Sequence, residues 1–97
     1  MWLVGRNATA KWISTDDEIS QCVSLSLQLC IMDEDSKLKI VAVMAEGLAS
    51  KIDRFEWPVP LDTLPSDGYF LRIACLRAPP IDEPLYSYSS RFTVRAQ

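Results

Sequence analysis

The sequence contains no histidine, only three glycines, and three cysteines without a Cys-x-x-Cys pair. The absence of histidine excludes zinc sites of the Cys/His type and catalytic sites that use a histidine base. No Gly-rich phosphate loop and no G-x-S-x-G elbow is present, so the motifs of phosphoryl transfer and of serine hydrolases are missing. We therefore expect a protein that is not an enzyme and that carries no metal and no cofactor.

Basic residues are also scarce and long apolar runs are missing. Ten Lys and Arg residues against 13 Asp and Glu give a net charge of −3, which argues against a nucleic-acid partner, because phosphate contacts require a basic surface. No apolar run reaches the ~18 residues of a membrane span. The first residues, Met1 to Gly5, lack the features of a secretory signal, which leaves two explanations open: a cytoplasmic protein, or a signal already removed.

What the sequence does contain is alternation. Residues 22–32 read C-V-S-L-S-L-Q-L-C-I-M, in which apolar and small polar side chains alternate strictly. Such alternation predicts a half-buried β-strand rather than a helix. The turn formers at 33–36 and the β-rich residues 37–44 extend this to a hairpin with a four-residue loop.

Further short strands are predicted along the rest of the chain. We place them at residues 2–4, 8–13, 51–57, 69–76 and 86–94, separated by polar or proline-containing loops. Residues 45–50 fit either a loop or one helical turn, and residues 14–18 a polar loop. About seven short strands with turns between them predict an all-β protein, an antiparallel sandwich of the immunoglobulin or fibronectin-III kind. A chain of 97 residues suits one such domain, spanning residues 1–97.

Three segments resemble the fungal Kre9/Knh1-like domain of the Ser-Thr-rich, GPI-anchored cell-wall family. The first is Gly5 followed by A-T-A-K-W at 8–12, the second is F-E-W-P-V-P at 55–60 leading into L-P-S-D-G-Y-F-L-R-I at 64–73, and the third is Y-S-Y-S-S-R-F-T-V at 86–94. The resemblance implies an Ig-like domain that is extracellular in fungi and associated with β-glucan and wall assembly. No catalytic residues come with the family.

Aromatic side chains supply both core and ligand-binding candidates. For the core we expect Trp12, Leu25, Leu27, Leu29, Trp57, Tyr69, Leu71, Ile73 and Phe92. Trp12, Trp57 and Tyr69 have a second interpretation as a platform on which sugars stack. Tyr69 follows Asp67-Gly68 at a strand start, where β-sandwiches place a tyrosine corner whose hydroxyl holds the preceding loop.

A ligand-binding surface is predicted from Trp2, Tyr86, Tyr88 and Arg91. The two tyrosines are two residues apart, so they share one face of a strand. If that face is outward, Tyr86 and Tyr88 form a platform with Arg91 nearby. Packing in the core or at a sheet edge is the alternative for these aromatic residues.

The cysteines predict three free thiols. Cys22 and Cys30 share the serine face of one strand at a separation of ~26 Å, whereas Cys75 lies on the opposite, core face. No pair then meets the Cα separation of less than ~7 Å that a disulfide needs. Three thiols fit a reducing compartment, which keeps a cytoplasmic location as the alternative to the cell wall.

The remaining polar motifs have simple interpretations. The acidic runs at 33–35 and 16–18 lack the spacing of a calcium loop, so solvated loops are expected. Asn7-Ala8-Thr9 is an N-glycosylation sequon, which makes Asn7 a candidate modification site in a secreted protein.

Two functions follow. The first is a wall module whose partner is β-glucan or a cell-wall glycoprotein. The second is an intracellular Ig-like domain that binds a protein partner, or a second copy, through an exposed strand edge.

Overall fold

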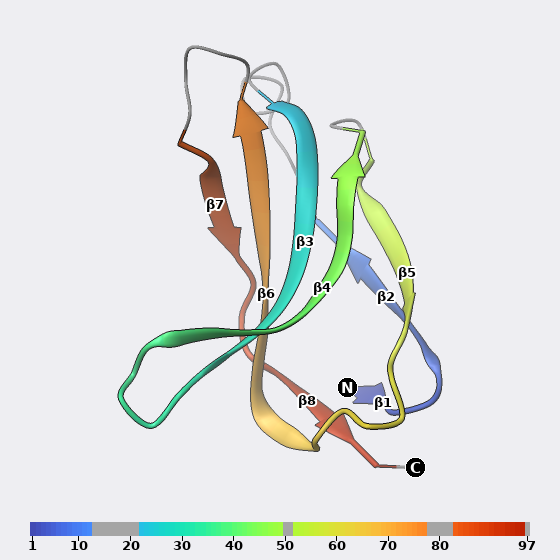
Figure 1. Ribbon diagram of the computed structural model, residues 1–97. Helices are drawn as coiled ribbons and strands as arrows, with labels where there is room; N and C mark the ends of the chain where they lie inside the picture. Colours follow the sequence, from blue (N-terminus) through green and yellow to red (C-terminus); the bar gives the residue numbers. More distant parts are fainter. Residues whose placement is uncertain (13–21, 50–51, 78–82, 97) are drawn as a thin grey trace.

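The computed structural model describes residues 1–12, 22–49, 52–77 and 83–96, and in these ranges the chain forms eight strands and no helix (Figure 1). The strands are β1 (Trp2–Leu3), β2 (Asn7–Lys11), β3 (Cys22–Met32), β4 (Leu38–Leu48), β5 (Arg54–Pro58), β6 (Ser66–Arg77), β7 (Leu85–Tyr88) and β8 (Phe92–Arg95). The predicted loop at 14–18, with its acidic run, lies outside the described residues. No helix suited to crossing a membrane occurs in the described ranges.

The strands form two sheets. The larger sheet has the order β1-β8-β6-β3-β4, with β7 also paired to β6, and the smaller sheet consists of β2 and β5. All pairs are antiparallel except β1 with β8, where Trp2 lies opposite Val94. Figure 1 shows the β2–β5 ribbon standing beside the curled larger sheet. The immunoglobulin-like β-sandwich is therefore confirmed.

The core fills the space between the sheets. Leu27 and Leu29 of β3 are almost fully buried, and they belong to one cluster with Ala8 of β2 and Trp57 of β5. Burying each leucine contributes about 1.5–3 kcal/mol. The serines and Gln28 that alternate with these leucines point to the opposite face of the larger sheet, as strand periodicity requires.

The other predicted core residues lie at graded depths. Leu25 and Tyr69 are buried, and the half-buried side chains that pack against the cluster are Trp12, Leu71, Ile73 and Phe92. The Tyr69 hydroxyl donates a hydrogen bond to the Leu64 carbonyl over 2.6 Å. This bond ties the loop before β6 to the strand, as the tyrosine-corner interpretation predicts.

Residues 45–48 differ from the expectation of a loop or helical turn. They continue β4, because Ala45 pairs with Leu27 and Leu48 pairs with Leu25. Gly47 has a φ of 68°, a conformation that glycine adopts without steric cost. Pairing with β3 therefore overrides the weak local preference of this segment.

The predicted last strand, residues 86–94, is interrupted. Its two parts, β7 and β8, pair with different stretches of β6. Between them the Ser89 N–H donates to the Leu71 carbonyl over 2.9 Å, and the Leu71 N–H donates to the Ser89 hydroxyl over 2.8 Å. The serine side chain thus replaces a backbone acceptor, a competition typical of serine, and the regular ladder stops there.

The expectation of three free thiols is wrong. Cys22 and Cys75 form a disulfide with their Cα atoms 5.3 Å apart, and Cys30 is a buried free cysteine. The cause is a bulge at the start of β3, since Cys22 pairs with Arg77 but Ser24 already pairs with Leu76. The extra residue breaks the alternation and turns Cys22 to the face of Cys75.

Candidate binding surface

Tyr86 and Tyr88 lie on the face of the larger sheet that points away from the core. In the ladder between β7 and β6, Tyr88 is opposite Arg72 and Tyr86 is opposite Ala74. The two rings therefore share a face with Arg72, and they are 45% and 57% exposed. This is the outward orientation on which the predicted platform depends.

Arg72 lies at the centre of this face and is held by two contacts. Its guanidinium carbon is 4.3 Å from the centroid of the Tyr86 ring, and its Nε donates to Gln28 Oε1 over 2.6 Å. Gln28 is the ladder partner of Arg72 on β3. The cation–π contact fixes the plane of the guanidinium and the hydrogen bond fixes its rotation, so the side chain is preorganised.

Phe70 supports the other tyrosine. The rings of Phe70 and Tyr88 are tilted with their centroids 6.2 Å apart. Phe70 is buried and pairs with Cys30 of β3. Burial raises the pKa of the Cys30 thiol, and the positive charge of Arg72 offsets part of that rise. A buried thiol with a raised pKa is a poor nucleophile, so Cys30 contributes packing rather than chemistry.

We call the set Gln28, Phe70, Arg72, Tyr86 and Tyr88 the aromatic face. Its exposed rings can cover the apolar faces of sugars, and its amide and guanidinium can hydrogen-bond hydroxyl groups. In the part of the chain that the structure describes, no group of three or more Cys, Asp or Glu side chains is arranged to hold a metal ion. The arrangement is suited to binding.

Trp2 does not join this surface. Trp2 packs on Phe92 and Trp57, with ring centroids 4.7 and 6.0 Å apart, and therefore lies against the core. Arg91 is exposed in the segment between β7 and β8. Of the four predicted ligand-binding residues, Tyr86 and Tyr88 share this face, Trp2 lies against the core, and the place of Arg91 in the site stays a prediction.

Sequence reasoning missed Arg72 and Gln28. Both occupy outward positions in strongly alternating segments, so the alternation could have indicated that their side chains lie on the outer face. Their contact, however, joins residues 44 positions apart in sequence. It depends on the pairing register of β3 and β6, which alternation within one strand does not specify.

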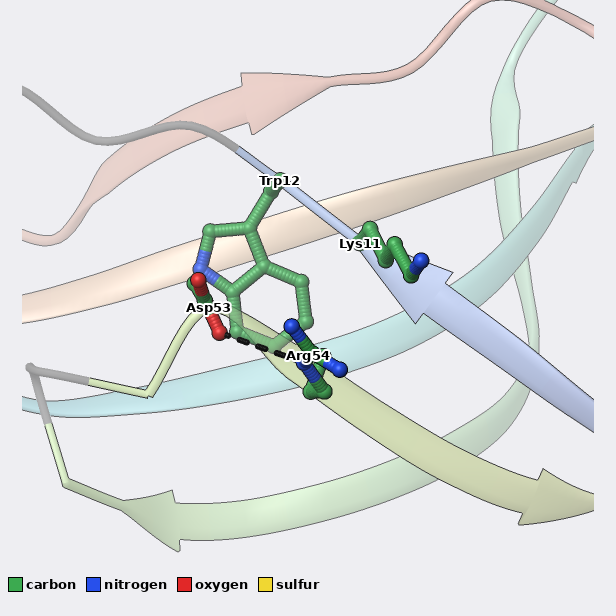
Figure 2. A pocket seen from close by; sticks show the side chains of 4 residues that line it. All are labelled: Lys11, Trp12, Asp53 and Arg54. Carbon is green, nitrogen blue, oxygen red and sulfur yellow. Dashed lines mark ion pairs between the residues drawn. The ribbon is translucent and has the colours of Figure 1, made fainter.

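A pocket lies at one end of the β2–β5 ribbon. The pocket has a volume of about 390 Å³ and is lined by Lys11, Trp12, Asp53 and Arg54, whose side chains are drawn in Figure 2. Arg54 and Asp53 form an exposed ion pair at 3.6 Å, which contributes little to stability. Trp12 Nε1 is buried and has no hydrogen-bond partner among the described residues. We assign this pocket no ligand.

At the acidic tip of the β3–β4 hairpin, the Asp33 side chain binds the backbone of its own turn. Asp33 Oδ1 accepts hydrogen bonds from the backbone N–H groups of Asp35 and Lys37, each at 2.9 Å. These bonds stabilise the turn, in which Ser36 has a φ of 60°. The carboxylate of Asp33 therefore has a structural role.

The sequon lies on β2. Asn7 and Thr9 are exposed, whereas Ala8 between them is buried. Both side chains thus lie on the outer side of the smaller sheet, on a strand that does not contribute to the aromatic face. Asn7 remains a candidate for glycosylation.

Comparison with known proteins gives one match. A family model described as Kre9/KNH-like N-terminal Ig-like domain matches residues 1–94. No curated protein and no solved structure matches the chain.

Proposed function

Since the chain belongs to the Kre9/KNH-like family of N-terminal Ig-like domains, which is associated with the cell wall, we propose that it is a non-catalytic module that binds β-glucan through its aromatic face. The observation that carries the proposal is the pair of exposed tyrosines on one face of β7, with Arg72 beside them. Aromatic rings bury the apolar faces of sugars, and the polar groups between them bind hydroxyls.

The shape of the surface favours a polymer. The aromatic face is part of an open β-sheet surface, whereas small ligands usually bind in concave pockets that enclose most of their surface. Tyr86 and Tyr88 are about 6.6 Å apart along the strand. A polysaccharide lying across β7 and β6 can contact both rings and Arg72 at once.

An extracellular location is consistent with the cysteines. The Cys22–Cys75 disulfide is the kind of bond that persists in oxidising compartments. In a secretory host, the exposed Asn7 is then a substrate for N-glycosylation. We expect a mass decrease on glycosidase treatment that an Asn7→Gln variant lacks; an unmodified Asn7 in secreted protein would remove this assignment.

The test is retention on insoluble β-1,3-glucan, β-1,6-glucan, chitin and cellulose. Wild-type protein is expected to bind one of the β-glucans, and a Tyr86→Ala/Tyr88→Ala double variant is expected to lose retention. A Leu61→Ala variant is the control, because Leu61 is an exposed apolar residue in the loop between β5 and β6. Circular dichroism of each variant establishes that it is folded.

Two results would overturn the proposal. The first is no retention on any of the four polymers. The second is retention that survives in the double variant, which would place binding elsewhere on the molecule.

A second candidate is a protein-interaction domain. Among the described strands, β4 pairs only with β3, so its other edge is unpaired. Ile40, Val41 and Val43 are exposed on this strand. An edge of this kind can accept a strand from another chain. We expect a Val43→Lys variant to abolish such pairing, and size-exclusion chromatography with light scattering to detect self-pairing if a second copy is the partner.

A further inference from the structure

Arg72 is a half-buried cation, and no ion pair to it is found in the part of the chain that the structure describes. Its ladder partners are Gln28 on β3 and Tyr88 on β7. The next residues on the same face of β6 are Phe70 and Ala74. Within the described residues, the ion pair found is Arg54 with Asp53, and Arg54 belongs to the smaller sheet. The ladder partners of Arg72 and its same-face neighbours on β6 are therefore neutral.

This arrangement leaves most of the guanidinium's binding capacity unused. A guanidinium has five N–H donors, and the described contact to Gln28 occupies the one on Nε. The two terminal NH₂ groups form a planar fork, which matches a carboxylate or phosphate group in geometry and charge. Stacking on Tyr86 holds that fork at the surface where a ligand would lie.

We propose that Arg72 is the specificity-determining residue of the aromatic face and binds an anionic substituent, a carboxylate or a phosphate, on the wall glycan. This inference rests on the proposed function, since it places the anion on the polymer that Tyr86 and Tyr88 bind. The rings contact the sugars, and the fork of Arg72 selects chains that carry the acidic group. A neutral glucan binds the same face through the rings and through hydrogen bonds to its hydroxyl groups, without an anionic partner for Arg72.

The net charge of the protein makes the inference testable. At −3, the molecule as a whole repels polyanions. A preference for an acidic polymer therefore cannot come from general attraction, and it must come from a local cation. Replacing one neutral acceptor by a charged one strengthens the hydrogen bonds by an amount equivalent to about tenfold in affinity.

The experiment compares one soluble β-glucan in three forms: unmodified, carboxymethylated and phosphorylated. Dissociation constants are measured by biolayer interferometry for wild type, Arg72→Gln, Arg72→Lys and Tyr86→Ala/Tyr88→Ala. For wild type we expect about tenfold tighter binding of at least one acidic form than of the unmodified glucan, and this preference should shrink as salt rises. The acidic form that binds more tightly distinguishes carboxylate from phosphate.

The variants separate the two proposals. Arg72→Gln should bind all three forms equally, and Arg72→Lys should keep a reduced preference because it retains charge without the fork. Equal wild-type binding of the three forms, or a preference that persists in Arg72→Gln, refutes the role of Arg72 while glucan binding through the tyrosines stands. Absence of binding to every form refutes both proposals.

Discussion

Cys22 and Cys75 join neighbouring strands of the same sheet, β3 and β6. In antibody domains the corresponding bond connects the two sheets through the core. Here it crosses one end of the larger sheet, and Cys75 is also the ladder partner of Leu85 at the start of β7. The disulfide therefore fixes the part of β6 against which the tyrosine-bearing strand pairs.

Removing this bond should lower stability strongly. The cysteines are separated by 53 residues, and the loop-closure entropy of a ring of that size corresponds to about 4 kcal/mol. A Cys22→Ala/Cys75→Ala variant is expected to lose about this amount in guanidinium unfolding. Wild-type protein treated with dithiothreitol should lose a similar amount. If reduced wild type and oxidised wild type unfold at the same denaturant concentration, the bond does not stabilise the fold.

Cys30 should be unreactive in the folded protein. It is fully buried, and burial raises the pKa of its thiol, so little reactive thiolate forms. Titration with Ellman's reagent is expected to detect almost no thiol in native protein, one per chain in denaturant, and three in denaturant after reduction and removal of the reductant. Three thiols without reduction would disprove the disulfide.

Tyr69→Phe should cost about 1 kcal/mol, because it deletes the hydrogen bond to the Leu64 carbonyl and keeps the ring. Tyr86→Phe is the control, since Tyr86 is exposed and surface changes usually stay within about 0.5 kcal/mol. Urea unfolding of the two variants measures the difference. Equal effects would show that the tyrosine corner contributes nothing measurable.

Tyr69 should also make the free energy of unfolding depend on pH. Burial raises the pKa of Tyr69 above its ordinary value of 10.0, so the folded protein holds this proton more tightly than the unfolded chain. The resulting stability is complete below pH 10 and is lost as the pH rises through the folded-state pKa. Tyr69→Phe lacks this component, and its unfolding free energy should fall less than that of wild type in alkaline buffers. A parallel fall in both proteins would contradict the assignment.

Trp2→Ala should affect stability. Trp2 is half-buried against Phe92 and Trp57, so we expect a loss of about 2–3 kcal/mol, somewhat below the 3–5 kcal/mol of a fully buried aromatic residue. Glucan retention of the folded variant should equal that of wild type. Tyr88→Ala should give the opposite pattern, with nearly unchanged stability and weakened retention. If folded Trp2→Ala lost its retention on glucan, Trp2 would have to be part of the binding surface.

Periodicity alone predicted the parts of the fold that depend on one strand at a time. The alternation in residues 22–32 placed Leu25, Leu27 and Leu29 on one buried face, and all three lie in the interior. The bulge beside Cys22 could not be predicted this way, because it arises where β3 and β6 fit together. One inserted residue reversed the predicted face of Cys22 and changed the predicted oxidation state of the protein.

In the candidate site, too, features within one strand were predicted and features that depend on strand pairing were not. Spacing of two put Tyr86 and Tyr88 on one side of a strand, and the structure places them so. Arg91 was placed near the tyrosines because it follows them closely in the chain, and Trp2 was included as a further aromatic residue. Arg72 and Gln28 reach the tyrosines only through the lateral order of β7, β6 and β3. Composition and local pattern do not contain that order.

The parallel pairing of β1 with β8 has a practical consequence. Trp2 lies beside Val94, so the two ends of the described chain leave the molecule together, and Figure 1 shows both at the end opposite to β7. An affinity tag, a bead or a sensor chip attached at either terminus would hold the protein by that end. The tyrosine-bearing strand would then project outward, which gives one orientation to every immobilised copy and keeps the tether away from an arriving polymer.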